Sequence, residues 1–173
     1  DPHAPTSTDA RPVHYGVVAV ALVVVAVEIA LPLRHLVMPG DVRWSEEGYR
    51  WSWRVLVTER SGIATFHVTD PGTGRTAISL PSDHLTPQQV TYVSSRPEAL
   101  RQYAHFLAGR YAEMWHLPPG SAPVVTVDAW VTVNGSARSR IVDPTVDLAR
   151  ASPALTRPSW VLPAPWDHRA SHH

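Results

Sequence analysis

The side chains that could carry chemistry are scattered along this 173-residue chain and form no compact motif. Ten His residues invite a metal site, but no two of them show HExxH spacing or another zinc-ligand signature. Cys is absent, which excludes disulfides, thiolate metal sites and a Cys nucleophile. No Ser lies in a GxSxG elbow, and no glycine-rich phosphate loop joins a strand to a helix. The residues therefore indicate neither a metal centre nor a familiar nucleophile.

Charged side chains give weaker candidates. Glu46 and Glu47 are adjacent, and because sequence neighbours point apart, they fit a solvated rim better than an acid–base pair. Asp143 precedes a proline and is more readily a turn-fixing side chain than a metal ligand. Arg138 and Arg140 share one face of a predicted strand, which fits a partner surface and equally a solvent-facing side. Taken alone, these residues predict a domain that binds or positions a partner.

Composition narrows the choice of partner and fold. The 15 basic and 15 acidic residues balance, so electrostatics favours no nucleic-acid partner. Every basic residue besides His is Arg, and the chain has no Lys. Seventeen Pro and nine Gly predict short elements joined by many turns.

The N-terminal region holds the strongest hydropathy signal. Gly16–Val27 is apolar on every face, and with its flanks the stretch Val13–Leu33 reaches the roughly 20 residues that cross a ~30 Å hydrocarbon layer, so we predict a transmembrane helix in a lipid bilayer. A signal peptide fits less well because the preceding flank is not basic. Glu28 either lies near the membrane interface or faces other helices, and the second alternative makes the chain part of a polytopic protein.

Short alternating segments follow the predicted span. We predict helices from Pro87, capped by Thr86, to residue 95 and from Pro97 to about Trp115. Ser61–Gly62 and Asp70–Gly74 are predicted as turns, and Asn134–Gly135 as a hairpin turn with positive φ. Strands are predicted over 53–58, 63–69, 75–80, 124–133 and 136–142.

The predicted fold class is α+β: one N-terminal transmembrane helix followed by an antiparallel, β-rich, sandwich-like extracytoplasmic domain with two inserted helices. The predicted divisions are a polar segment over 1–12, the span over 13–33, the β-rich domain over 34–163 and a flexible tail over 164–173.

Seven strings in the chain are distinctive enough to compare with known families. They are Arg34–Gly40, Trp44–Trp53, Asp70–Gly74, Leu85–Gln89, Gln102–Leu107, Ile141–Ala149 and Ser159–Pro163. In this order, from about Leu31 to Pro163, they resemble the vitamin K-dependent gamma-carboxylase family. The likeness is greater to the bacterial members, which carry the membrane domain called HTTM, than to the animal enzymes.

The resemblance implies a polytopic membrane enzyme that uses vitamin K hydroquinone, O2 and CO2. In such an enzyme the oxygenated hydroquinone becomes a strong base, which removes a γ-proton from glutamate, and the carbanion attacks carbon dioxide. The family's initiating base is a Lys on a membrane helix. Because this chain has no Lys, the resemblance implies that catalysis resides in transmembrane helices outside the chain.

The chain would then be the last membrane helix and the lumenal-type domain, with the remaining transmembrane helices and a glutamate-containing protein substrate as partners. For a bacterial relative, the resemblance implies the inner membrane with an extracytoplasmic domain. Its matching substrate-contact candidates are His35, Tyr49, Arg50, Ser52 and Trp53. Arg50 has forked donors that can pair with a carboxylate. Trp53, like Trp44, has the alternative role of anchoring the domain at a membrane interface.

Three hypotheses remain open from the sequence. The first is part of a gamma-carboxylase-like enzyme, and the second is a membrane-tethered β-rich binding module without catalysis. The third is a relative that performs different quinone or redox chemistry on the same scaffold.

Overall fold

The computed structural model describes residues 15–33, 44, 58–153 and 158–166 of the chain. The helices are α1 (Tyr15–Leu33), a short 3-10 helix η2 (Pro81–Asp83), α3 (Pro87–Ser95) and α4 (Pro97–Met114). The strands are β1 (Arg60–Thr69), β2 (Thr76–Ser79), β3 (Val124–Val133) and β4 (Ser139–Arg140). The four strands form one antiparallel sheet in the order β2-β1-β3-β4.

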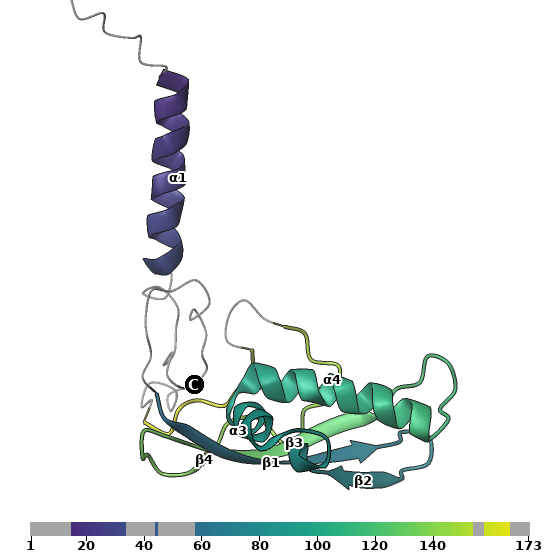
Figure 1. Ribbon diagram of the computed structural model, residues 1–173. Coiled ribbons are helices and arrows are strands. Elements are labelled where there is room, and N and C mark those ends of the chain that lie inside the picture. The colour runs from purple at the N-terminus through teal and green to yellow at the C-terminus, as the bar shows by residue number, and fades with distance from the viewer. Residues whose placement is uncertain (1–14, 34–43, 45–57, 154–157, 167–173) are drawn as a thin grey trace, which may run out of the picture.

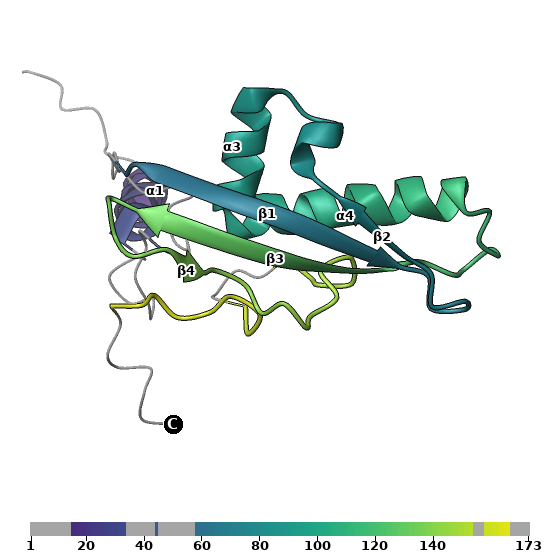
Figure 2. The same ribbon diagram turned by 90° about the horizontal axis from the view of Figure 1, so that it is seen from below.

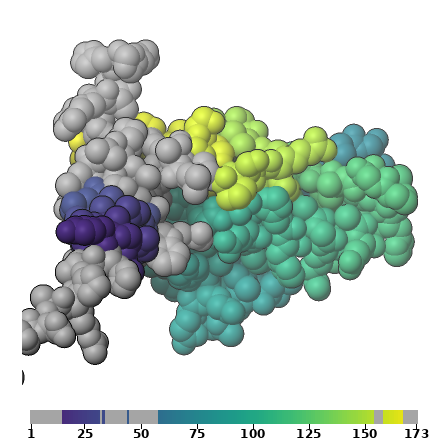
Figure 3. All heavy atoms as spheres, turned by 90° about the horizontal axis from the view of Figure 1, so that it is seen from above, coloured from purple at the N-terminus to yellow at the C-terminus, as the bar shows by residue number. Residues whose placement is uncertain are grey.

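The sheet has one covered face and one open face. Helices α3 and α4 lie across the covered face, and no described helix or strand crosses the other (Figure 1). Seen from below, β1 and β3 lie in front of α4 (Figure 2). Seen from above, α3, α4 and the yellow C-terminal segment form much of the described surface (Figure 3). The domain therefore has two layers, with its core between the sheet and the helices.

The long pairing of β1 with β3 builds this core. All ten residues of each strand are in register, from Arg60 opposite Val133 to Thr69 opposite Val124. Successive side chains of a strand point to opposite faces, so every second residue is directed at the helices. These inward side chains are almost fully buried, and they are Ala64, Phe66 and Val68 of β1 with Val125, Val127, Ala129, Val131 and Val133 of β3.

Local capping chemistry explains where α3 and α4 begin, and both helix predictions are confirmed. The Thr86 hydroxyl accepts from the Gln89 amide, and the Gln89 side chain accepts from the Thr86 amide at 3.0 Å, a reciprocal capping box. Each helix has Pro at its first position, where a missing N–H costs nothing. The covered side of α4 buries Leu100, Tyr103, Ala104 and Leu107, as its periodicity predicts.

Two predicted turns are also confirmed. The Asp70 carboxylate accepts from the Gly72 amide at 2.9 Å and from the Thr73 hydroxyl at 2.6 Å, which fixes the connection from β1 to β2. At the end of β3, Asn134 and Gly135 have φ of 48° and 72°, the left-handed conformations that a tight hairpin requires.

The chain after β4 closes the far edge of the sheet. The Leu148 amide donates to the Val125 carbonyl at 2.8 Å, and the Asp147 side chain accepts from the Val125 amide at 3.0 Å. Trp160 is buried in the core, and its carbonyl accepts from the Asp143 amide at 2.9 Å. An irregular segment thus satisfies backbone groups of β3 where no strand pairs with it.

The prediction of a transmembrane helix over Val13–Leu33 is wrong. The helix observed there, α1, begins at Tyr15 and has 19 residues. Among the residues that the structure describes, no helix combines the length and the apolar character that crossing a membrane requires.

The predicted sandwich is also wrong, because the described strands form a single sheet whose second layer is helical. The return strand predicted over 136–142 is shorter in the structure and comprises only Ser139–Arg140. Ser139 pairs with Val131, and Arg140 pairs with Trp130. The strand predicted over 53–58 lies almost wholly outside the described residues, and Thr58 is not in a strand.

The turn predicted at Ser61–Gly62 is wrong because both residues lie within β1. Gly62 serves a different purpose there. A Cβ on this residue would lie 2.2 Å from the backbone oxygen of Ser94, at the end of α3. Glycine therefore allows the helix backbone to approach the strand closely.

We predict that Gly62→Ala destabilises the domain by about 1–3 kcal/mol, because the helix must move away from the sheet. Urea unfolding followed by tryptophan fluorescence measures the change. Gly109→Ala is the matched control, since that helical position has open space around it and gains about 1 kcal/mol in helix propensity. Equal effects at the two positions would contradict the close-approach role.

The turn at Asp70 predicts an acid dependence of stability. Hydrogen bonds from the Thr73 hydroxyl and the Gly72 amide lower the pKa of the Asp70 carboxyl group in the folded protein. Because the pKa of Asp70 is lower in the folded protein than in the unfolded chain, its ionised carboxylate stabilises the fold at pH values above the unfolded pKa. This contribution is lost as the pH falls through the folded pKa. We expect Asp70→Asn to flatten the decline of unfolding free energy below about pH 4. If the unfolding free energy of Asp70→Asn falls with decreasing pH as steeply as that of the wild type, the role of this turn is contradicted.

Candidate functional site

The five substrate-contact candidates of the sequence all lie outside the described residues. These are His35, Tyr49, Arg50, Ser52 and Trp53. Whether they meet a substrate stays a prediction. The one described residue of that segment is Trp44.

Trp44 lies in the core of the domain, with 1% of its surface exposed. Its indole Nε1 donates to the Leu162 carbonyl at 2.8 Å, and its ring meets Trp166 edge-on at 5.5 Å between centroids. The guanidinium of Arg60 donates to the Trp44 carbonyl. The alternative in which Trp44 sits at a membrane interface is therefore wrong, since this ring is enclosed by the domain.

The open face of the sheet is the largest continuous surface that the described strands leave uncovered. None of its side chains is buried. Apolar, hydroxyl and charged groups alternate across it, and Ile63 is 55% exposed and Ile78 65% exposed. The register defines the open face as Ile63, Thr65 and His67 of β1, Thr126, Asp128 and Trp130 of β3, Ile78 of β2 and Arg140 of β4.

Arg140 is held in place at one side of this face. Its Nε donates to the Asp128 carboxylate at 3.0 Å, and its guanidinium carbon lies 4.8 Å from the centre of the Trp130 ring. Trp130 is directly opposite Arg140 in the β3–β4 ladder, so the aromatic ring and the carboxylate both reach the guanidinium from β3. Such a preorganised guanidinium can receive a further anion with little loss of side-chain entropy.

A second set of polar side chains lies on the helical side of the domain. The Tyr103 hydroxyl lies 2.9 Å from Nδ1 of His84 and donates to the Leu80 carbonyl at 3.3 Å. Burial raises the pKa of the Tyr103 phenol, so the group stays protonated at neutral pH. Phe66 and Phe106 pack against the same ring. These contacts tie η2 to α4 and give the cluster a structural role.

We predict that Tyr103→Phe lowers the unfolding free energy by about 1 kcal/mol, because the ring packing stays and only the hydroxyl's hydrogen bonds are lost. Tyr92→Phe is the control, since Tyr92 is 55% exposed and its hydroxyl has no hydrogen-bond partner among the described residues. Denaturant unfolding of both variants checks this. Equal losses of unfolding free energy in the two variants would contradict a stabilising role of the buried Tyr103 hydroxyl.

The described part of the chain contains a hollow. The hollow lies beside Trp166, and the rest of its described lining is Val133, Asn134 and Ser136. Its volume is about 230 Å³. Sites for drug-sized ligands usually have about 300–1,000 Å³, and an ionisable base is absent from this described lining. Within the described ranges, no three His, Asp or Glu side chains gather closely enough to hold a metal ion.

The sequence pointed to Arg138 and Arg140 but not to the face that they border. The alternation of β1 and β3 distinguishes two faces, yet it does not reveal that helices cover only one of them. The ladder that places Trp130 opposite Arg140 depends on the length of the turn after β3.

Fold and site together define a two-layer α+β domain whose sheet has one uncovered face. The family model described as "Vitamin K-dependent gamma-carboxylase, lumenal domain" matches residues 14–167. The chain therefore belongs to the vitamin K-dependent gamma-carboxylase lumenal domain family, and the family-level resemblance seen in the sequence is confirmed. No solved structure matches the chain.

Proposed function

We propose that this domain positions a glutamate-containing protein substrate for a carboxylase whose catalytic centre lies outside the chain. The observation that carries the proposal is the uncovered sheet face in a member of this family. Both ten-residue strands contribute to that face, whereas the opposite face of the same strands is occupied by α3 and α4.

The chemistry of the open face suits a polypeptide. Ile63, Ile78 and Trp130 offer apolar and aromatic surface to side chains, while the neighbouring threonines offer hydroxyl groups. Aromatic residues and Arg are enriched in protein interfaces, and here Trp130 and Arg140 lie together. The face is wide and lacks a deep pocket among its described residues, which favours an extended or folded protein over a small molecule.

The rest of the proposed reaction belongs to other parts of the complete protein. The absence of Lys removes the family's initiating base from this chain. We place the use of vitamin K hydroquinone, O2 and CO2 in transmembrane helices outside this chain. For a bacterial member, we place this domain on the extracytoplasmic side of the inner membrane.

A domain that binds a protein without supporting carboxylation is the competing function. It would use the same open face, so binding alone does not separate the two. Incorporation of labelled CO2 into a bound protein by the complete protein, with hydroquinone supplied, separates them.

We predict that Ile63→Gln in the complete protein raises the KM for a protein substrate about fivefold, because about 1 kcal/mol of apolar contact is lost. The kcat with a short glutamate peptide should stay unchanged, since the chemistry lies elsewhere. Labelled CO2 incorporation measures both values.

Met114→Gln is the matched control, because Met114 is 53% exposed on α4, on the other side of the sheet, while Ile63 is 55% exposed. An equal KM for wild type and Ile63→Gln would contradict the use of the open face. A change in kcat for the short peptide would contradict the assignment of catalysis to other helices.

A further inference from the structure

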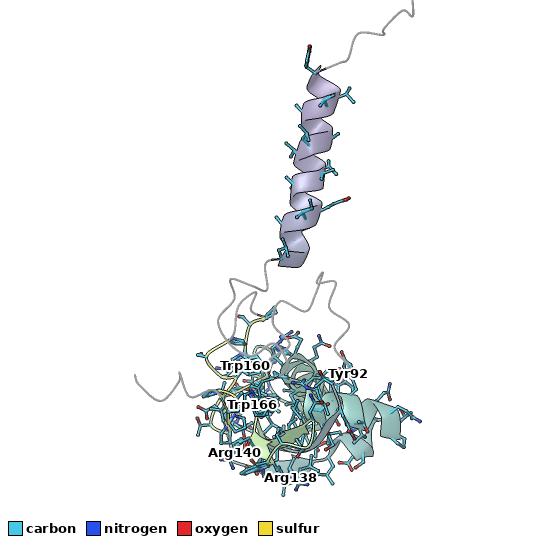
Figure 4. The ribbon with its side chains drawn as sticks, turned by 90° about the vertical axis from the view of Figure 1, so that its left-hand side faces the viewer. Tyr92, Arg138, Arg140, Trp160 and Trp166 are labelled. Atoms are coloured by element: carbon cyan, nitrogen blue, oxygen red, sulfur yellow. The ribbon has the colours of Figure 1, made fainter. Side chains whose placement is uncertain are left out.

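The outer edge of β2 has no described strand beside it. In the order β2-β1-β3-β4, this strand pairs with β1 alone, and Figure 2 shows it at the border of the sheet. The other border differs, because the chain after β4 supplies hydrogen bonds there, and Figure 4 shows Arg138, Arg140, Trp160 and Trp166 on that part of the domain. The sequence of β2, Thr-Ala-Ile-Ser, has none of the charges or prolines that shield many edge strands. Its backbone can therefore accept another strand.

The hydrogen-bonding phase of the β1–β2 ladder shows which backbone groups point outward. The Asp70 amide donates to the Arg75 carbonyl at 2.8 Å. The adjoining pair, Thr69 and Thr76, is therefore a non-hydrogen-bonded pair, and the close approach in such a pair fits the 3.0 Å between their hydroxyl oxygens. The two kinds of pair alternate, so Ile78 also belongs to a non-hydrogen-bonded pair. The amides and carbonyls of Thr76 and Ile78 thus point away from β1.

The chain closes this edge itself just beyond Ile78. Leu80 is the next residue in the same phase. Its amide donates to the Asp83 carboxylate at 2.7 Å, and its carbonyl accepts from the Asp83 amide at 3.0 Å. Among the described residues, no hydrogen bond serves the outward groups of Thr76 and Ile78 in this way. These two amides and two carbonyls are named the β2 edge.

Side chains around the β2 edge define the strand that would fit it. Ile78 is 65% exposed, so an added strand can gain apolar contact there. Arg75 immediately precedes β2, Asp83 lies beyond its end, and both are exposed. An antiparallel strand starts at the Asp83 end and finishes at the Arg75 end. A basic residue at its start and an acidic residue at its end would therefore complement both charges.

We propose that the β2 edge binds an extended segment of another protein as an added antiparallel strand. The segment has β-branched residues at its centre, a basic residue before them and an acidic residue after them. In this mode of recognition, main-chain hydrogen bonds supply affinity and the side chains supply specificity. The inference goes beyond the proposed function, because the backbone at the sheet edge makes the contacts and no carboxylation is required.

A Lys-Val-Thr-Val-Glu segment fits the register of this edge. Its first Val lies opposite Ile78, its Thr opposite Ala77 and its second Val opposite Thr76. Both Val residues then exchange hydrogen bonds with β2, whereas the amide of the central Thr points away from it. The Lys lies at the Asp83 end and the Glu at Arg75.

The test titrates the complete 173-residue chain with a capped Lys-Val-Thr-Val-Glu peptide and follows the backbone amide signals by NMR. We expect the amides of Thr76 and Ile78 to shift more than that of Ala77, which points to β1. N-methylation of the first Val should weaken binding about fivefold, because one hydrogen bond is lost. N-methylation of the central Thr, whose amide points away, should leave the affinity largely unchanged.

Ile78→Pro is the corresponding change in the protein. Proline lacks the outward amide but leaves the bonds between β1 and β2 in place. We expect it to bind the peptide about fivefold more weakly than Ile78→Val, which keeps the amide and a β-branched side chain. Ile63→Gln should bind like wild type, since Ile63 lies on β1 outside the part that pairs with β2. If Ile78→Pro fails to fold, the two N-methylated peptides decide the question with the wild-type chain.

Three results would overturn the proposal or part of it. Equal weakening by N-methylation of Val and of Thr would exclude backbone pairing, as would unshifted amides at Thr76 and Ile78. The peptide Glu-Val-Thr-Val-Lys should bind more weakly at low salt, and equal binding would overturn the antiparallel orientation. Sedimentation of the chain alone tests a second copy as the occupant. A dimer that Ile78→Pro dissociates would assign the β2 edge to self-association instead.

Discussion

The ten-residue antiparallel pairing of β1 with β3 is the constraint on which the other features of the domain depend. It aligns two alternating strands so that their apolar residues, such as Phe66 and Val127, point to one side. The helices α3 and α4 cover that side, and the alternate residues, which are of mixed polarity, form the open face. Gly62 belongs to the same constraint, because the strand can meet α3 closely only where it lacks a Cβ. Core and candidate binding surface are thus two sides of one ladder.

The edge of the sheet at β4 shows how an irregular segment can complete a regular one. With only two residues, β4 pairs over a small part of β3, and the chain after it supplies further hydrogen bonds at Val125. Trp44 joins this segment to the core through its bond to Leu162. The short β4 and the turn before it place Arg138 and Arg140 at the border of the open face. The position of Arg140 therefore depends on contacts made by residues far along the chain.

Features governed by local chemistry were predicted correctly from the sequence. Thr86 with Pro87 starts α3, and Asn134–Gly135 turns the chain after β3, because each depends on residues within a few positions. The reading of Ser61–Gly62 as a turn was wrong because a glycine needed for close helix packing has the same local signature as a glycine in a turn. The predicted membrane span was also wrong, because no described helix combines the length and the apolar character that crossing a membrane requires.

The sequence by itself determined the family, the helix caps, the turns at Asp70–Gly74 and Asn134–Gly135, and the alternation of the long strands. These follow from residue types at short spacing, and the ordered strings of the family are likewise written in the chain. The tertiary structure alone decided that the strands form one sheet, that helices cover a single face, and that Trp130 and Asp128 hold Arg140. Those outcomes depend on which distant segments pair and in which register, and neither is encoded at any one position.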